Sequence, residues 1–532
     1  MVDSALSEPS ELNAKRRDWL NWLLFVAWCV VVLFAVSRHE YWRDEIRAFS
    51  LARHSHSLVE LFHNLKDEGH PMLWHVLLYV GYGVTGSKYV LPTVAFVVAA
   101  SAVGLLIFKA PLPLWLKALF VMGGIPLYEY SVMARNYGIS MLFMFLFACL
   151  YQERKRRPIW IGCTLACLAN TNIHSMILAA LLLALWLCDE FVVHRVSMRG
   201  KPALRIYAAM LLVALGAAFA VATVWPSGQS ILVHPAHFTL ASVLRALGGA
   251  LSDPAGQFQS IAPREAGVPA WLSNIMLLTA TIGLIRRPLF MVSAWIVVIA
   301  LSVVFQLVYP GSYRHQALFV VFLMTLYWLD GAHPKAIQSR GMSWTTLAGN
   351  YVGLPALLIT LVLMGAYKLS KDVLSPQSAS KLFGDFIKNH PEFARSVVVA
   401  EPDWVLESLS YYVDNRLYII RERHFGDVVR FTRASKVHLT AGELLDATRS
   451  LGQSERQEVL VLVGHASEFA ASLAEPNLAT PHEIVYDFGT SFSWSASDLK
   501  AWKSSMTRIA QFSDGIVGDE RYDVYQLTGA HN

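Results

Sequence analysis

Long apolar runs follow one another through the first 370 of the 532 residues, and few charged residues interrupt them. The first run, from about residue 19 to 36, is long enough to cross a bilayer as a helix. Further runs lie near residues 88–108, 113–129, 132–150, 159–173, 175–193, 203–225, 270–285, 289–308, 315–330 and 346–367. Charged residues make up only 16% of the chain, against about 25% in a soluble domain. The sequence therefore predicts a polytopic α-helical membrane protein with about eleven spans.

The basic residues indicate how these spans are oriented. Lys15, Arg16 and Arg17 precede the first run, and the basic loops at 154–157 and 286–287 fall on the same side of the membrane. Because basic loops stay in the cytoplasm, the N-terminus is expected there. An odd number of spans then leaves the C-terminus on the opposite face. These loops account for the net charge of +5, which requires no nucleic-acid partner.

Two segments between the first and second spans are expected to lie in the membrane interface. The apolar stretch from Pro71 to Val84 is about 14 residues long, which is marginal for a crossing. Residues 43–65 place Ile46, Phe49 and Leu61 roughly on one face, which is typical of an amphipathic helix. The orientation above holds only if the first of these segments does not cross the membrane.

The chain changes character after residue 370. Short β-branched runs predict strands at 396–399, 417–420 and 459–463, and amphipathic stretches predict helices near 404–411, 441–450 and 467–474. This alternation predicts a small α/β domain over residues 371–532, after a transmembrane domain over residues 1–370. All five cysteines lie in apolar runs, so neither a disulfide framework nor a cysteine metal site is expected.

Polar residues gather at the ends of the spans, on the face opposite the N-terminus. The pair Asp44-Glu45 follows the first span directly, where charge is costly unless it is solvated or used. The other candidates stand in later segments of this face: Arg47, Asp67, Glu68, His70, Arg135, Tyr137, His174, His234, His237, Arg314 and His315. The spans themselves are nearly free of acids, whereas a channel would carry charges within its spans.

This arrangement fits group transfer from a lipid-linked donor. A carboxylate such as Asp44 can take the proton of an acceptor hydroxyl, and arginines can neutralise a phosphate leaving group. His70 could contact phosphate or a divalent metal ion, although no ligand spacing identifies a metal and no cofactor is strictly implied. Plainer roles stay open: Asp44 as a solvated acid, an Arg47–Asp44 pair on one helical face, and an Arg135 that reaches to lipid headgroups.

Three stretches, in order and on one face, resemble motifs of the GT-C glycosyltransferases, which are integral-membrane enzymes that use polyprenyl-phosphate sugars. Residues 43–47 are similar to the acidic motif of the first external loop, and residues 67–74 to the second acidic element. Residues 130–137 are similar to the Ser…Ala-Arg-x-Tyr stretch at the start of a later span. Two interfacial helices after the first span are also a feature of that fold. The resemblance covers roughly residues 15–330 and is nearest to the bacterial aminoarabinose and galacturonic acid lipid A transferases and the protein O-mannosyltransferases.

The resemblance implies a membrane glycosyltransferase that moves a sugar from a polyprenyl-phosphate donor to a lipid, polysaccharide or protein acceptor. It would act at the periplasmic face of a bacterial inner membrane, with the N-terminus in the cytoplasm and the C-terminal domain in the periplasm. Asp44 would be the catalytic base, with Glu45 beside it. The substrate-binding residues would be Arg47, Asp67, Glu68, His70, Arg135, Tyr137, His174, Arg314 and His315.

Two other classes of function stay open. A transporter or flippase of an amphipathic lipid would use the far-face charges as a gate, but the chain shows neither paired charges inside its spans nor inverted-repeat symmetry. A non-catalytic scaffold would use the C-terminal domain to recruit partners, and it would not need acids beside a lipid-accessible cavity.

Overall fold

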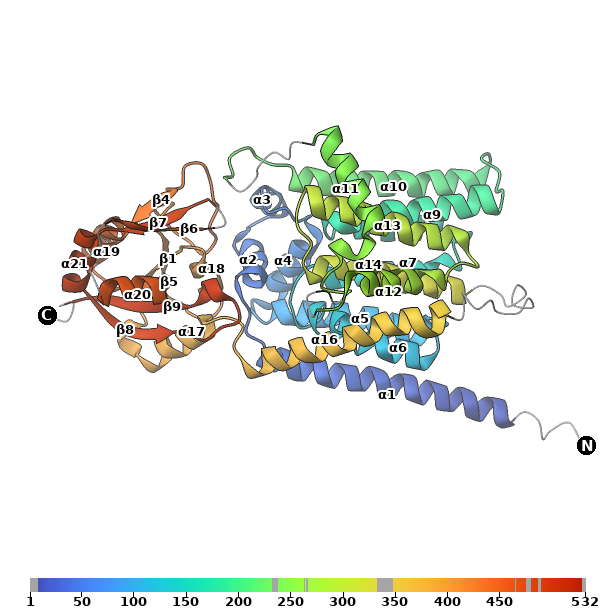
Figure 1. Cartoon of the computed structure of the whole chain (residues 1–532), viewed down its shortest axis with the longest axis horizontal. Helices are drawn as coiled ribbons and strands as arrows, with labels where there is room; N and C mark the ends of the chain where they lie inside the picture. The colour runs from blue at the N-terminus through green and yellow to red at the C-terminus, as the bar shows by residue number, and fades with distance from the viewer. Residues whose placement is uncertain are drawn as a thin grey trace, which may run out of the picture.

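The computed structural model describes residues 8–231, 238–262, 264, 267–332, 348–464, 466–474, 480–486 and 489–528. The candidates His234 and His237 lie outside these ranges. The described chain has two parts that lie side by side along its long axis, a bundle of helices and a smaller part built on β-sheets (Figure 1). Each part has a hydrophobic core of its own. The predicted polytopic helical protein with an α/β part at its C-terminus is thus confirmed.

Helical structure occurs at the position of every predicted span. Six stretches are long and apolar enough to cross a membrane: Arg17–Arg38 within α1 (Glu8–Arg38), Val90–Lys109 (α5), Ile173–Val193 (α9, Ile173–Leu187, with η2, Cys188–Val193), Lys201–Val224 (α10), Pro288–Leu307 (α13) and Gly349–Leu374 (η6, Gly349–Gly353, with α16, Leu354–Leu374). The other predicted spans correspond to helices that are shorter or less apolar: α6 (Leu114–Val121), η1 (Ile125–Glu129), α7 (Tyr137–Tyr151), α8 (Pro158–Ala169), α12 (Ala270–Ile282) and α14 (Tyr313–Gly331).

The single helix predicted over residues 113–129 is wrong, because this segment is the two short helices α6 and η1. Between them, Gly124 meets α16 so closely that a Cβ atom on it would lie 2.7 Å from the Cα of Gly365. The two glycines let these backbones approach one another. This crossing places the C-terminal half of α16, which contains Lys368, next to η1.

The helix α14 occupies the centre of the bundle, since every residue from His315 to Leu329 is buried. Its first turn is fixed by Ser312, whose hydroxyl lies 2.8 Å from Nδ1 of His315. A helix that is packed on all sides has little freedom to shift. Arg314 and His315, in the first turn, are therefore held at one end of the bundle.

The single amphipathic helix predicted over residues 43–65 is also two helices, α2 (Arg43–His54) and α3 (Leu58–Asn64). The break occurs because the hydroxyl of Ser57 accepts a backbone N–H and caps a new helix. α2 buries Phe49 against Trp74 of α4 (Leu73–Thr85), the helix predicted over residues 71–84. This packing fixes α2, which carries Asp44, to the end of the bundle.

One helix of the bundle was not predicted. The chain forms α11 (Leu240–Ser252) where the sequence suggested only a long loop over residues 226–269. Thr239 and Ser242 form a capping box at its start, a signal that the sequence contains. Its apolar side chains, such as Leu240 and Leu251, are largely exposed.

The C-terminal part is built on a six-stranded sheet in the order β3-β2-β1-β5-β9-β8. These strands are β1 (Val397–Glu401), β2 (Leu417–Ile419), β3 (His424–Phe425), β5 (Val459–Gly464), β8 (Met506–Phe512) and β9 (Tyr522–Leu527). β1 pairs in parallel with β2 and β5, and the remaining pairs are antiparallel. A second sheet contains β4 (His438–Thr440), β7 (Ser491–Trp494) and β6 (His482–Val485). The helices are α17 (Ser380–Asn389), α18 (Val405–Leu409), α19 (Ala441–Glu455), α20 (Ala466–Ala474) and α21 (Ala496–Ser505).

The three predicted strands and three predicted helices of this part are confirmed as β1, β2, β5, α18, α19 and α20. The strands β3, β4, β6, β7, β8 and β9 and the helices α17 and α21 were not predicted. The boundary predicted at residue 370 falls inside α16, which continues to Leu374.

The C-terminal part sits directly on α2, with α18 next to it (Figure 1). Tyr411 shares a buried apolar cluster with Ile46 and Phe49 of α2. The hydroxyl of Tyr412 donates to the carbonyl of Tyr41 at 3.0 Å. Thus α2 is held between the bundle on one side and the C-terminal part on the other.

Candidate functional site

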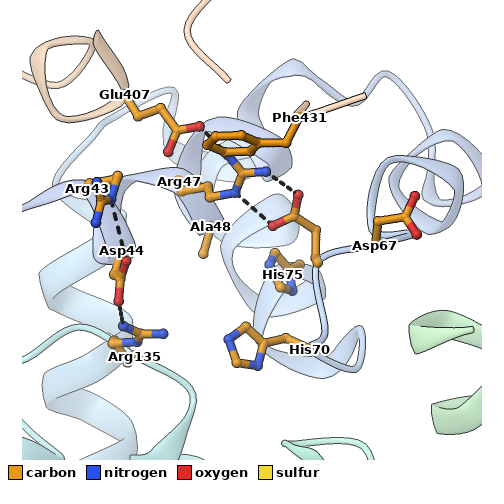
Figure 2. Close-up of a pocket in the computed structure, with 11 residues that line it drawn as sticks. Arg43, Asp44, Arg47, Ala48, Asp67, His70, His75, Arg135, Glu407 and Phe431 are labelled. Carbon is orange, nitrogen blue, oxygen red and sulfur yellow. Dashed lines mark hydrogen bonds and ion pairs between the residues drawn. The ribbon is translucent and has the colours of Figure 1, made fainter. Parts of the chain in front are cut away.

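Asp44 stands in the first turn of α2, and its carboxylate forms an ion pair with Arg135 (Figure 2). Two further guanidinium groups are near, since Arg43 Nε and Arg314 Nη1 lie 3.8 and 3.9 Å from its carboxylate oxygens. Burial alone would raise the pKa of Asp44, but these three cations hold it well below its usual range. The side chain is still 34% exposed. Asp44 is therefore an ionised carboxylate that reaches open space.

That space is a cavity of about 200 Å³, which we call the interdomain cavity. Six of the predicted site residues line it: Asp44, Arg47, Asp67, Glu68, His70 and Arg135. The rest of the lining is Arg43, Ala48, His75 and two residues of the C-terminal part, Glu407 and Phe431 (Figure 2). The three stretches that resemble family motifs thus meet around one space, and the C-terminal part contributes to its wall.

Arg47 joins the acidic elements to the C-terminal part and does not pair with Asp44. Its Nε and Nη2 donate to the two carboxylate oxygens of Glu68 at 2.8 and 2.6 Å. Its Nη1 donates to Glu407 and, at 2.9 Å, to the carbonyl of Val429. The Arg47–Asp44 pair considered from the sequence is therefore wrong, because Glu68 offers the guanidinium a bidentate partner.

A second link joins the start of α2 to the C-terminal part. The backbone N–H of Arg43 donates to Glu520 at 3.0 Å, and its guanidinium pairs with Asp519 at 2.9 Å. A carboxylate at the N-terminus of a helix satisfies an otherwise unpaired N–H and is favoured by the helix dipole. Residues 476 and 477 positions away in the sequence thus hold the turn that contains Asp44.

Glu45 is fully buried and does not line the interdomain cavity. Its carboxylate accepts the N–H of Ala134 at 2.5 Å and lies 3.0 Å from Nε2 of His39. The other ring nitrogen of His39 lies 2.9 Å from Asp372. Burial lowers the pKa of His39, but the two carboxylates outweigh it and raise the pKa to about 10. Glu45 therefore ties α1, α2 and α16 to the residue that precedes Arg135.

The segment from Asp67 to His70 turns sharply, with φ of +71° at Asp67 and +69° at Gly69. The carboxylate of Asp67 accepts the N–H of Ser227 at 2.8 Å and also its hydroxyl. Asp67 therefore fastens the chain after α10 and turns away from Asp44 (Figure 2). The ring of His70 points toward the Asp44–Arg135 pair, and burial lowers its pKa to about 3, so it is neutral.

Three predicted residues do not line the interdomain cavity and pack against one another inside the bundle instead. The hydroxyl of Tyr137 lies 2.7 Å from Nε2 of His315, and the rings of His174 and His315 are 4.8 Å apart. Both ring nitrogens of His315 are engaged, since Ser312 contacts the other one. Tyr137, His174 and His315 are thus placed to support the site from within the bundle.

Arg314 connects Asp44 to a second cavity of about 290 Å³, which we call the basic cavity. Its lining is Tyr128, Glu129, Met133, Ser312, Tyr313, Arg314, Tyr367, Lys368, Lys371, Gln377 and Ile516. Glu129 pairs with Arg314 and with Lys368, each at 3.2 Å. Lys371 has no ion-pair partner among the described residues. Three cations therefore face one carboxylate in this cavity.

Within the described ranges, no group of three or more histidine, cysteine or acidic side chains is placed to hold a metal ion. The chemistry available to the site is that of an ionised carboxylate surrounded by guanidinium groups. Such a site can accept a proton at Asp44 and bind a phosphate group through paired, charge-assisted hydrogen bonds.

Several residues of the two cavities were not predicted from the sequence. Lys368 and Lys371 follow the last span and lie one helical turn apart, a signal that could have placed them on one face. No such signal marks Glu407 and Phe431 in the interdomain cavity, or Glu520, which lines neither cavity but bonds to Arg43. Only tertiary packing brings these residues to α2.

No family model matches the sequence, and no curated protein matches it. Among solved structures, the chain is similar to the crystal structure of ArnT from Cupriavidus metallidurans bound to undecaprenyl phosphate. The TM-score is 0.48 and the identity is 12%, over 96% of this chain and 98% of that one. The apo structure of the same protein has a TM-score of 0.48 and 13% identity, over 95% and 97% of the two chains.

Proposed function

We propose that this chain is a membrane glycosyltransferase that moves a sugar from a polyprenyl-phosphate donor to an acceptor, with Asp44 as the general base. The observation that carries the proposal is the position of Asp44. Its ionised carboxylate opens into the interdomain cavity, and it lies 3.9 Å from Arg314, which lines the basic cavity. A base between one cavity for an acceptor and another for a phosphate is what transfer requires.

The basic cavity is the proposed site of the donor phosphate. Arg314, Lys368 and Lys371 outnumber the one carboxylate in its wall. Arg135 lines the neighbouring interdomain cavity, and its partner Asp44 lies 3.9 Å from Arg314. Paired N–H groups of guanidinium suit a phosphate better than isolated charges do. In this proposal Arg135 and Arg314 bind the phosphate, while the segment Asp67 to His70 forms the opposite side of the site.

The guanidinium groups also regulate the base. While they hold the pKa of Asp44 low, its carboxylate is a weak proton acceptor. A donor phosphate that takes the N–H groups of Arg135 and Arg314 would release Asp44, whose pKa would then rise because the group is buried. Asp44 would become an effective base only with donor bound, which limits wasteful hydrolysis of the donor.

The proposed step is a single displacement at the anomeric carbon. Asp44 takes the proton of the acceptor O–H, and the acceptor oxygen forms a bond to that carbon. The bond from the carbon to the phosphate oxygen breaks, and its electron pair leaves with the polyprenyl phosphate. Arg135 and Arg314 stabilise the negative charge that develops on the leaving phosphate.

The proposed topology places the site and the C-terminal part, residues 371–532, in the periplasm of a bacterial cell and the N-terminus in the cytoplasm. Two observations support it. The start of α1, at Glu8, and the C-terminal part lie at opposite ends of the bundle (Figure 1). α7 begins two residues after Arg135 and ends at Tyr151, so the basic residues 154–157 follow the end of this helix that is away from the site. The C-terminal part would then act as a domain that closes the cavity over Asp44.

Mass spectrometry of lipid, polysaccharide and glycoprotein fractions tests the proposal, in cells with the chain and in cells without it. The proposal predicts a saccharide-sized mass increase in one fraction that depends on the chain. If all three fractions are unchanged, the proposed transfer is wrong and lipid transport becomes the better hypothesis.

A further inference from the structure

The interdomain cavity and the basic cavity differ in their charge. Four carboxylates line the interdomain cavity (Asp44, Asp67, Glu68 and Glu407), against three guanidinium groups (Arg43, Arg47 and Arg135). Its two histidines add no positive charge near neutral pH, because burial lowers the pKa of His70 to about 3 and that of His75 to about 4. The interdomain cavity therefore carries no excess of positive charge.

The three guanidinium groups of the interdomain cavity are already bound to carboxylates. Arg135 pairs with Asp44, and Arg47 is shared by Glu68 and Glu407. Arg43 pairs with Asp519, a residue outside the cavity lining. In the proposed reaction the donor phosphate takes the N–H groups of Arg135, so a second phosphate in this cavity would have to displace Glu68 or Glu407 from Arg47 and leave that carboxylate buried without a partner, at a high cost. A phosphorylated group is therefore disfavoured here.

The remaining features of the cavity suit a sugar. The ring of Phe431 belongs to the core of the C-terminal part and is 7% exposed, and it forms part of the wall beside Arg47, opposite the polar groups of the segment from Asp67 to His75 (Figure 2). An aromatic face together with fixed hydrogen-bonding groups is a typical wall for an uncharged polar ligand. The volume of about 200 Å³ is below the roughly 300–1,000 Å³ of sites for drug-sized ligands, and it limits the bound group to about one ring.

We propose that the interdomain cavity is the acceptor subsite, that it takes the hydroxyl group of an uncharged saccharide rather than a phosphate, and that Phe431 of the C-terminal part contacts that saccharide. This inference rests on the proposed glycosyl transfer. The acceptor hydroxyl loses its proton to Asp44 and becomes the oxygen of a new glycosidic bond. The donor phosphate stays on the other side of Arg314, in the basic cavity.

The chemical linkage of the transferred sugar tests this assignment. The product that forms only with the wild-type chain is isolated, and its linkage is determined by mild acid hydrolysis, ³¹P NMR and methylation analysis. An acid-stable glycosidic bond to a sugar hydroxyl supports the proposal. A glycosyl phosphodiester, or a bond to a serine or threonine of a protein, overturns it. Failure of the proposed function is distinct from these outcomes, because no sugar would then be transferred at all.

A substitution of Phe431 tests the role of the C-terminal part separately. In membranes that contain donor and the isolated acceptor, Phe431→Ala should raise the acceptor KM about fivefold, because an apolar contact with the saccharide is lost. Phe425→Ala, in strand β3 and outside the lining of this cavity, is the matched control and should leave the acceptor KM unchanged. An unchanged acceptor KM in a folded Phe431→Ala variant would contradict the contact.

Discussion

Asp44 and Arg135 form an ion pair between residues 91 positions apart, at the wall of a cavity that the bundle and the C-terminal part share. Hydrogen bonds hold the backbone next to each partner in place. The first turn of α2 is held by Glu520 at the backbone N–H of Arg43, and the residue before Arg135 is held by Glu45 at the N–H of Ala134. A reacting group that is fixed in this way needs little reorganisation during the reaction.

Arg135→Gln should change the pH dependence of transfer as well as its rate. Transfer requires an ionised Asp44, and the cations that include Arg135 hold its pKa low. Without Arg135 this pKa rises, so the acid limb of the kcat/KM profile should move to higher pH. The rate at neutral pH should fall by about 10² or more, because a donor to the leaving phosphate is lost. An unchanged acid limb would show that Arg135 does not set the state of Asp44. Arg449→Gln, on the exposed face of α19, is the control.

Lys371→Gln and Arg314→Gln should each weaken donor binding. One charge-assisted hydrogen bond contributes about 1.5–3 kcal/mol, so the donor KM should rise roughly tenfold or more. Lys388→Gln removes an exposed lysine of α17 that pairs with Asp385, and it should leave the donor KM unchanged. If Lys371→Gln and Lys388→Gln behave alike, the basic cavity does not hold the phosphate.

The contact between the bundle and the C-terminal part should weaken as the pH rises from about 4.5 to about 7. Burial raises the pKa of Glu407 and of Glu520 from an ordinary 4.5 to about 7, although Arg47 and Arg43 act in the opposite direction. Between about pH 4.5 and 7 the folded state therefore keeps protons that the unfolded state has lost. The stabilisation of the folded state by these protons is fully present below about pH 4.5 and is lost as the pH approaches 7. Thermal unfolding followed from pH 5 to pH 8 should show a falling midpoint. The double variant Glu407→Gln, Glu520→Gln should flatten that fall, and an equally steep curve would argue against these two groups as its source.

Glu45→Ala should destabilise the protein, because it leaves His39 with one of its two carboxylate partners and leaves the N–H of Ala134 unpaired. Removal of one partner of a buried ion pair costs about 3–5 kcal/mol. Denaturation of the purified variant measures this cost, with Asp446→Ala on the exposed face of α19 as the control. A Glu45→Ala protein of normal stability would mean that the buried network does not hold α2 in place.

The sequence predicted those parts of the site that lie next to span ends. Asp44, Arg135 and Arg314 each stand within a few residues of an apolar run, so the apolar runs and the basic loops together predicted that they lie on one face. The partners of these residues were harder to foresee. Arg47 is one turn from Asp44, yet it bonds to Glu68 and Glu407, because bidentate contacts outweigh proximity along a helix. Glu407 and Glu520 reach α2 only through the docking of the C-terminal part, for which no local pattern exists.

The helices and strands also fall into those that the sequence predicts and those that it does not. Continuous apolar runs and β-branched strands such as β1 and β5 were predicted well, since burial on both faces makes them apolar along their whole length. Strand β8, with the exposed Arg508 and Gln511, lies at the edge of the sheet and lacks that signal. The break between α2 and α3 depends on a single cap at Ser57, which an amphipathic pattern over residues 43–65 does not reveal.

The most direct test of the central claim is the transfer rate of Asp44→Asn in membranes, measured with the donor and acceptor that the wild-type chain uses. Asparagine keeps the shape of the side chain but cannot take a proton at neutral pH. The exposed Asp385→Asn is measured beside it as a control, and the amount and thermal stability of each protein are determined. Our account predicts that Asp44→Asn loses about 10²–10⁴-fold in rate at normal abundance and stability, while Asp385→Asn does not. A folded Asp44→Asn protein that transfers sugar at the wild-type rate would contradict the account.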